Sequence, residues 1–222
     1  MGALENTILK EAHTLIGGTT GSGKSSLIHS IIGEVIKNPT CNMRLVLIDL
    51  KRVELIEWKD SKHCLTFIND PKLVCPCLNA YIQLMQTRYQ KMEKQGLTQS
   101  PYTHIYIVID ELADVVTTNP QAIYLIAKIG RLGRAANIHL ILGTQDCSRK
   151  TISAIIQQNI TCALALRCKT SIESRQVLGI SGAEKLPRNG QGILWNANGY
   201  QTINIPYFSK EDRIKARQEE AN

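Results

Sequence analysis

A glycine-rich run near the N-terminus has the residue types and the spacing of a phosphate-binding loop. It reads Gly18-Thr19-Thr20-Gly21-Ser22-Gly23-Lys24-Ser25, matches the pattern G-x-x-x-x-G-K-[ST], and is followed by Ser26. Glycines let the backbone turn its N–H groups around phosphate oxygens, and the positive end of a following helix points at the same anion. Lys24 is placed to reach the β and γ phosphates, and the Ser25 hydroxyl is a ligand for Mg²⁺. We therefore expect residues 18–26 to bind a nucleotide.

Two adjacent acids, Asp110 and Glu111, follow the apolar run Ile105-Tyr106-Ile107-Val108-Ile109. Hydrolysis of a nucleoside triphosphate needs a carboxylate that holds the metal and a group that orients the attacking water. We assign Asp110 to the Mg²⁺ and Glu111 to the water, as catalytic base. Gln145 ends another apolar run, and we expect it to sense the γ-phosphate or to position water, because the carboxyl ends of parallel strands meet at the ligand crevice.

Other polar residues offer less. The chain has no guanine-reading Asn-Lys-x-Asp segment, which favours ATP as the nucleotide. Asp49 also ends an apolar run, and its simplest role is to start the following turn. The Cys75-Pro76-Cys77 segment, with His63 and Cys64 nearby, lacks the two-residue spacer and the second pair of a zinc site, so we do not expect zinc there.

These residues require a sheet that brings them to one edge. Short apolar runs rich in β-branched residues alternate with helical patterns, which predicts an α/β fold with a mainly parallel sheet and helices on both faces. Strands are expected at Thr14 to Gly17, Arg44 to Asp49, His104 to Asp110, Asn137 to Gly143 and Thr161 to Arg167. Helices are expected to begin near Lys24, Leu78, Gln121 and Thr151, the first stopped by Asn38-Pro39 and the second by Gly96.

The last part of the chain changes character after Pro187. Gly192 to Trp195 and Tyr200 to Ile205 alternate around an Asn-rich turn and predict an antiparallel hairpin at the sheet edge. Lys210 to Glu220 balances positive and negative residues and predicts a solvated helix. We expect one domain over 1–222, with a leader at 1–13, a core at 14–207 and a C-terminal helix or tail at 208–222.

Charge and cysteine content limit the partners and the compartment. The chain of 222 residues has 26 Lys and Arg and 19 Asp and Glu, a net charge of +7, and the stretch from Lys128 to Lys169 alone carries +6. Such a concentration indicates a polyanion partner or bound phosphate, or else a solvated cationic face. Seven irregularly spaced cysteines and no secretion signal indicate a reducing, cytoplasmic location. We expect no membrane segment, because the longest charge-free run, 189–209, is rich in Asn, Gln and Gly.

Several segments, in order, resemble the motor domain of the FtsK/SpoIIIE family of double-stranded DNA translocases. They are Ala12 to Gly18 leading into the glycine-rich loop, Ile48-Asp49-Leu50-Lys51-Arg52-Val53-Glu54-Leu55, Met85 to Tyr89, Val108 to Asp114, Gly133 to Leu140, Ser171 to Arg175 and Ser181 to Leu186. The resemblance runs from about Leu15 to Tyr207. It implies a RecA-like P-loop NTPase core that assembles as a homo-hexameric ring around duplex DNA and moves it by ATP hydrolysis.

The resemblance also implies active sites at subunit boundaries, where an arginine of the neighbour stabilises charge in the transition state. Arg134 and Arg175 are the candidates for this role in trans, and an intrasubunit salt bridge is the alternative for each. The family's Arg-Pro after the Thr-Gln pair is Asp146-Cys147 here, so that a phosphate or DNA role there is in doubt and passes to Arg149 and Lys150.

Three hypotheses follow from these residues. The leading one is an ATP-driven motor that translocates double-stranded DNA. The second is a protein-secretion or conjugative coupling ATPase on the same core, whose cargo is a polypeptide or nucleoprotein. The third is a nucleotide-dependent interaction module that does not hydrolyse ATP, against which Glu111 and Gln145 argue because both hydrolytic positions are filled.

Overall fold

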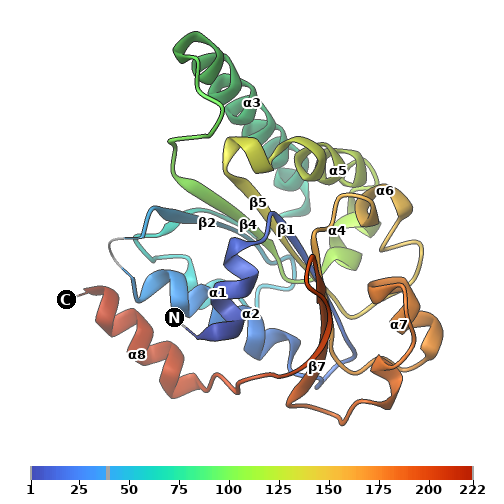
Figure 1. Cartoon of the computed structure of the whole chain (residues 1–222). Coiled ribbons are helices and arrows are strands. Elements are labelled where there is room, and N and C mark those ends of the chain that lie inside the picture. The colour runs from blue at the N-terminus through green and yellow to red at the C-terminus, as the bar shows by residue number, and fades with distance from the viewer. Residues whose placement is uncertain (1, 39–40, 222) are drawn as a thin grey trace.

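A single eight-stranded sheet forms the centre of the computed structural model, which describes residues 2–38 and 41–221 (Figure 1). The strands are β1 (His13–Gly17), β2 (Met43–Ile48), β3 (Cys64–Ile68), β4 (His104–Ile109), β5 (Ile138–Thr144), β6 (Cys162–Ala165), β7 (Gln191–Asn196) and β8 (Gly199–Asn204). Their spatial order is β3-β2-β4-β5-β1-β6-β7-β8. Strands β1 to β6 run parallel to one another. Strand β7 runs antiparallel to its neighbours β6 and β8.

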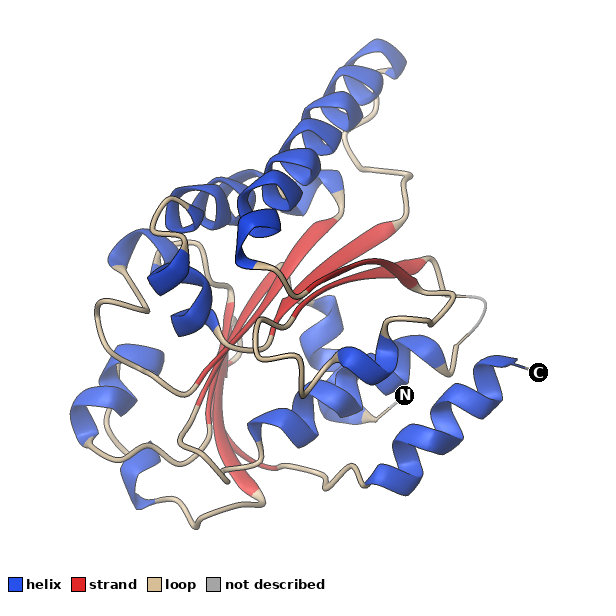
Figure 2. Ribbon diagram, turned by 180° about the vertical axis from the view of Figure 1, so that it is seen from behind, coloured by secondary structure: helices blue, strands red, loops and turns tan. Residues whose placement is uncertain are grey.

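Helices cover both faces of this sheet (Figures 1 and 2). One face carries α1 (Ala3–Lys10), α2 (Lys24–Ile36) and α8 (Lys210–Ala221). The other carries α3 (Pro71–Gln95), α4 (Leu112–Thr118), α5 (Ala122–Leu132), α6 (Ala154–Gln157) and α7 (Ser171–Leu178). Short 3-10 turns lie at Ile56–Trp58, Arg134–Ala136 and Ala183–Lys185.

The apolar pattern of the strands explains the two layers. In β4, Ile105, Ile107 and Ile109 belong to the core on one face, whereas Tyr106 and Val108 belong to the core on the other. A strand buried on both faces reads as a continuous apolar run, as parallel strands do. The polar residues that follow such a strand are therefore delivered to the carboxyl edge of the sheet with little freedom.

The structure confirms the fold class, the five expected strands to within about two residues, and the C-terminal hairpin. The helix expected near Leu78 instead begins at Pro71, because Asp70 caps it by accepting from the Lys72 N–H at 2.9 Å. Pro76 is tolerated in its second turn. Gly96 ends this helix with φ of 64°, as expected.

Other boundaries differ further from expectation. The helix expected near Thr151 is a single turn that begins at Ala154, and strand β3 has no counterpart among the expected strands. The expected leader at 1–13 contains α1, whose Ile8 and Leu9 are buried. Helix α2 ends at Ile36, and Pro39 of the expected stop lies outside the described residues. Within the described ranges, no helix has both the length and the apolar character needed to span a bilayer.

Candidate nucleotide site

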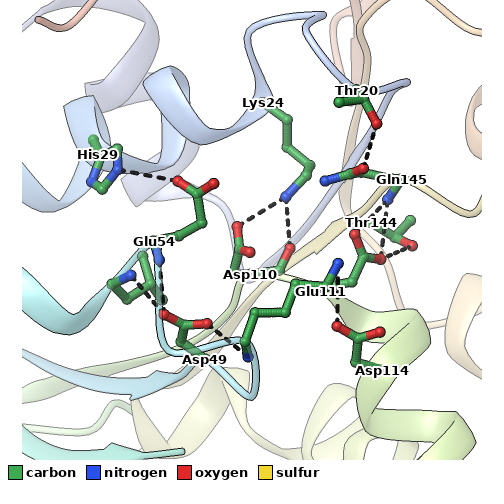
Figure 3. Close-up of polar contacts among 12 residues, drawn as sticks. Thr20, Lys24, His29, Asp49, Glu54, Asp110, Glu111, Asp114, Thr144 and Gln145 are labelled. Atoms are coloured by element: carbon green, nitrogen blue, oxygen red, sulfur yellow. Dashed lines mark hydrogen bonds and ion pairs between the residues drawn. The ribbon is translucent and has the colours of Figure 1, made fainter.

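The glycine-rich loop connects β1 to α2 at the carboxyl edge of the sheet (Figure 3). Gly21 and Gly23 have φ of 75° and 101°, in the left-handed region that glycine adopts without strain. The loop is tied to both neighbouring strands, because the Gly18 N–H donates to Thr144 O at 3.2 Å and the Thr19 N–H donates to Arg167 O at 2.9 Å. Its shape is therefore fixed by the sheet and not by the loop alone.

Lys24 and Asp110 form a buried ion pair below this loop. The Lys24 Nζ donates to Asp110 Oδ1 at 2.9 Å and to the Asp110 carbonyl oxygen at 2.8 Å, and both side chains are less than 5% exposed. Gly143 of β5 leaves room for the Asp110 carbonyl group, since a Cβ at position 143 would stand 2.5 Å from the Asp110 carbonyl oxygen. The predicted phosphate and metal residues are thus in direct contact.

Glu111 is held beside them by the end of β5. Its carboxylate accepts from Thr144 Oγ1 at 2.7 Å and from the Gln145 N–H at 3.0 and 3.1 Å. Thr20 Oγ1 of the loop donates to Gln145 Oε1 at 2.7 Å. The structure therefore brings Lys24, Asp110, Glu111 and Gln145 into one site, linked to the loop through Thr20.

The turn after β2 adds a carboxylate that the sequence interpretation did not select. Asp49 accepts backbone N–H groups from Lys51, Arg52, Glu54 and Leu55 at 2.9 to 3.1 Å, so that it starts the turn as expected. The turn aims Glu54 toward the loop (Figure 3). The pKa of Glu54 is lowered, chiefly because its carboxylate bonds to His29. Partial burial raises this pKa, whereas the charge of Lys24 and the hydroxyl of Ser25 lower it.

The donors at this edge fit a Mg²⁺ ion. The hydroxyl of Ser25 and the carboxylates of Asp110 and Glu54 are hard oxygen ligands, which Mg²⁺ uses sparingly together with substrate phosphates. Among the described residues no group of three His, Cys, Asp or Glu could hold a metal by itself. The buried Ser22 Oγ has no hydrogen-bond partner in the structure, which marks an unsatisfied polar group inside the loop.

A pocket of about 470 Å³ opens beside the loop. One wall consists of loop residues, including Lys24, Ser25 and Ser26, and Gln145 lies at the same pocket. The Ser26 hydroxyl accepts the Phe208 N–H at 2.8 Å, so its oxygen supports the chain segment after β8. A nucleotide with phosphates in the loop has room for its remaining part in this pocket.

The candidate arginines occupy three other places. Arg134 is exposed at the amino end of β5, at the opposite edge of the sheet from the loop. Arg175 is exposed on α7, where its Nη2 donates to Ser171 Oγ at 3.0 Å. Arg149 and Lys150 are exposed after β5, and Arg149 lines one groove with Arg175. Among the described residues, the groove that Arg149 and Arg175 line includes no residue of the glycine-rich loop.

The Asp146-Cys147 departure has a structural role. Asp146 accepts from the Ser148 N–H at 3.0 Å and from Thr151 Oγ1 at 2.8 Å. Desolvation raises the pKa of Asp146, but these bonds together outweigh it, so the pKa is lowered. Cys147 is buried against Gly17, with its Sγ 3.1 Å from the position of a Cβ there. These two residues therefore shape the turn that presents Arg149 and Lys150.

Three further features escaped the sequence interpretation: Glu54, the Thr144 hydroxyl, and Arg188. The guanidinium of Arg188 lies 3.6 Å from the position of a Cβ at Gly21. Glu54 lies in the segment from Ile48 to Leu55 that resembles the FtsK/SpoIIIE family, so this resemblance could have identified Glu54 as a site residue. Thr144 directly precedes Gln145, so the same strand end could have identified it. Arg188 reaches the loop only through a long-range contact that no local pattern records.

Comparison with known proteins agrees with this geometry. The FtsK/SpoIIIE family model matches residues 4–102. The chain is 35% identical over 224 residues to a DNA translocase FtsK of Helicobacter pylori and 33% identical over 236 residues to that of Streptomyces avermitilis. These matches include 93% and 94% of this chain but only 26% of either relative, so the chain spans about a quarter of their length.

Solved structures share the fold at lower identity. The pCW3 conjugation coupling protein TcpA with ATPγS superposes with a TM-score of 0.83 and 21% identity, over 96% of this chain and 65% of that one. The cytoplasmic domain of the Thermomonospora curvata type VII secretion ATPase EccC superposes with a TM-score of 0.76 and 23% identity, over 94% of this chain and 28% of that one. The RecA-like fold is therefore common to this chain, a conjugation coupling protein and a secretion ATPase.

Proposed function

The chain carries an FtsK/SpoIIIE-family core, and from that premise we propose that it is an ATP-hydrolysing motor that translocates double-stranded DNA. One observation supports hydrolysis above all others: Asp110 bonds Lys24 and Glu111 bonds the Gln145 N–H, and both Lys24 and Gln145 line the pocket beside the glycine-rich loop. The DNA cargo is supported by the FtsK relatives and by the +6 charge between Lys128 and Lys169. A cytoplasmic location fits a DNA motor with seven free thiols.

Each residue has a distinct task in this proposal. The loop N–H groups and Lys24 bind the phosphates of ATP, and the Lys24 charge opposes the charge that builds on the γ-phosphate. Ser25 and Asp110, with Glu54 nearby, would hold Mg²⁺, which neutralises phosphate charge when it is bound. Glu111 accepts the proton of the attacking water, and Thr144 and the Gln145 N–H orient its carboxylate. Gln145 couples that carboxylate to the loop through Thr20.

We propose that the chain assembles as a homo-hexameric ring around duplex DNA, in which exposed arginines act between subunits. In it, Arg134 or Arg175 of a neighbour completes the nucleotide site, and Arg149 and Lys150 contact DNA phosphates. Mixing two inactive variants tests this arrangement: Lys24→Ala subunits and Arg134→Ala or Arg175→Ala subunits should together regain turnover. Only an arginine that acts in trans allows this rescue, and an absence of rescue for both arginines contradicts the shared site.

ATP turnover with and without linear duplex DNA tests the DNA cargo. We expect stimulation at low salt that falls steeply as salt rises from about 50 to about 200 mM, because phosphate contacts release counterions. An assembled protein whose turnover ignores duplex DNA at low salt would contradict the proposal.

Replacement of Glu111 by Gln tests the hydrolytic assignment. Turnover should fall about 100-fold or more, with ATP retained, because the amide cannot accept the proton of the water. Glu93→Gln, at an exposed position on α3, is the matched control and should hydrolyse ATP like the wild type. Unchanged turnover in Glu111→Gln would remove the assignment.

A second function has a specific observation behind it. The folds of a conjugation coupling protein and of a secretion ATPase superpose on nearly the whole chain, so a polypeptide or nucleoprotein cargo is the alternative. Turnover that rises with a protein cargo and not with duplex DNA would favour this alternative.

A further inference from the structure

The wall of the nucleotide pocket opposite the glycine-rich loop consists of a short segment that follows the C-terminal hairpin. Ile205, Pro206 and Tyr207, which we call the strap, line this wall together with Asn189 and Gly190. The loop and the strap are far apart in the sequence: Phe208, next to the strap, is 182 residues from Ser26 of the loop. No motif in the sequence assigns it a ligand.

Several contacts fix the strap relative to the loop. The Ile205 N–H donates to Gly190 O at 3.0 Å, and the Phe208 N–H donates to Ser26 Oγ at 2.8 Å. The Phe208 ring fills the space over Gly33, where a Cβ would stand 2.6 Å from Cζ. The strap is therefore anchored at both ends, one end directly on the first turn of α2.

Tyr207 combines this fixed backbone with an exposed ring. Its side chain is 83% exposed, the largest exposed fraction of any large apolar side chain among the described residues, although the neighbouring Ile205 is buried. An aromatic ring beside an open pocket offers a flat face to a planar ligand. Burial of that face by a ligand would remove apolar surface from water.

The position of the phosphates determines what lies next to this ring. Lys24 and Asp110 mark the γ-phosphate end of the site, and Ser25 and Ser26 begin α2 on the side of the strap. A nucleotide that extends from the loop past Ser26 places its base between the strap and the Asn189 to Gly190 backbone. Among the described lining residues there is no Asp or Glu, the acceptor that a guanine-specific site uses.

We propose that the strap is the base-binding wall of the site and that Tyr207 stacks on the adenine of ATP. This inference rests on the proposed function, since it names the part of ATP that this wall recognises. Tyr207 thereby adds affinity for the nucleoside without touching the phosphates. Lys24 and the loop bind the phosphates whatever base is attached.

Binding of two ligands to the nucleotide-free monomer separates these contributions. ATPγS carries the base and inorganic tripolyphosphate does not, and both are titrated calorimetrically with Mg²⁺ present. Tyr207→Ala should weaken ATPγS binding about tenfold or more, by the usual loss of one base-aromatic stack, and leave tripolyphosphate binding unchanged. Tyr207→Trp should retain ATPγS affinity. Tyr124→Ala, which removes an exposed tyrosine from α5, is the control and should bind both ligands normally.

Each other result has a defined meaning. Equal ATPγS affinity in the wild type and Tyr207→Ala overturns the stacking role. Equal losses for ATPγS and tripolyphosphate also overturn it, because Tyr207 would then support the loop and not the base. A wild-type chain that binds neither ligand overturns the proposed function itself, which distinguishes that failure from a failure of the strap.

Discussion

A buried lysine and two buried carboxylates follow the carboxyl ends of β1 and β4, whereas three histidines, His13, His104 and His139, lie at the amino ends of β1, β4 and β5. Lys24 and Asp110 form an ion pair at the first edge, with Glu111 bonded beside them. At the second edge His104 Nδ1 lies 2.9 Å from His139 Nε2, and His139 Nδ1 lies 3.2 Å from Ala12 O. The same three strands thus carry two different polar clusters.

One of these bonds requires an uncharged ring, because His13 Nδ1 accepts the Leu140 N–H at 3.2 Å. His139 donates through Nδ1 to the Ala12 carbonyl, and its Nε2 shares one proton with His104 Nδ1. Burial first, and then the charge of a neighbouring histidine, lower the pKa of His139 to about 4 and that of His13 to about 3. The carboxyl edge therefore holds a buried ion pair, whereas burial opposes charge on the histidines of the amino edge.

Loss of one partner of the ion pair should have the largest effect on stability. Lys24→Ala leaves Asp110 buried without its cation and should lower the free energy of unfolding by about 3 kcal/mol. Chemical denaturation without nucleotide measures this loss. Lys51→Ala breaks a half-exposed pair with Asp114 at 3.3 Å and should change stability by less than about 1 kcal/mol.

A second substitution sharpens this test. Asp110→Asn in the Lys24→Ala background removes the unpaired charge and should recover part of the lost stability. If the double variant is as unstable as Lys24→Ala, the cost comes from lost packing and not from the unpaired carboxylate.

Acid should lower the free energy of unfolding through the histidines at the amino ends of the strands. A group with a lowered pKa in the folded state gives full stability above its unfolded value of about 6.5, and that stability is lost as the pH falls toward about 4. His139→Gln cannot take up the proton, so it should lose about 2 kcal/mol less than the wild type between pH 7.5 and pH 5. Denaturation curves at both pH values measure this difference. Equal losses in the two proteins would show that this edge does not titrate.

A smaller effect is expected from a single hydrogen bond at the carboxyl edge. Thr144→Val keeps the shape of the side chain but removes the hydroxyl, which lies 2.7 Å from Glu111 Oε1 and also accepts the Asp146 N–H at 3.2 Å. It should cost about 1 kcal/mol of stability and reduce ATP turnover while ATP affinity is kept. Thr144→Ser restores the donor and should recover turnover. A Ser variant as slow as the Val variant would assign the loss to packing.

The sequence was informative where local pattern decides structure. The glycine-rich loop with Lys24, the strand that ends in Asp110 and Glu111, and the hairpin are each contained within a few consecutive residues. Their types and spacing have one physical reading, because phosphate binding needs the glycines and a doubly buried strand needs the apolar run. The edge that gathers Gln145 with them follows from the parallel sheet.

Other features depend on contacts distant in the chain. The Cys75-Pro76-Cys77 segment hides the true start of α3, because the cap at Asp70 lies more than one turn before it. Strand β3 is half-exposed at the sheet edge and lacks a continuous apolar run. The strap lines the pocket only because Phe208 reaches Ser26 across the fold. Nothing in the residues around Tyr207 records that approach.

Displacement of a third DNA strand from a linear duplex most directly tests whether the carboxyl edge drives movement along DNA. A motor that moves along the duplex removes the bound third strand, and the released strand is measured with time. We predict displacement that requires ATP, is lost in Glu111→Gln and persists in the Glu93→Gln control. Displacement by Glu111→Gln at the wild-type rate, or ATP hydrolysis stimulated by DNA with no displacement, would contradict the account.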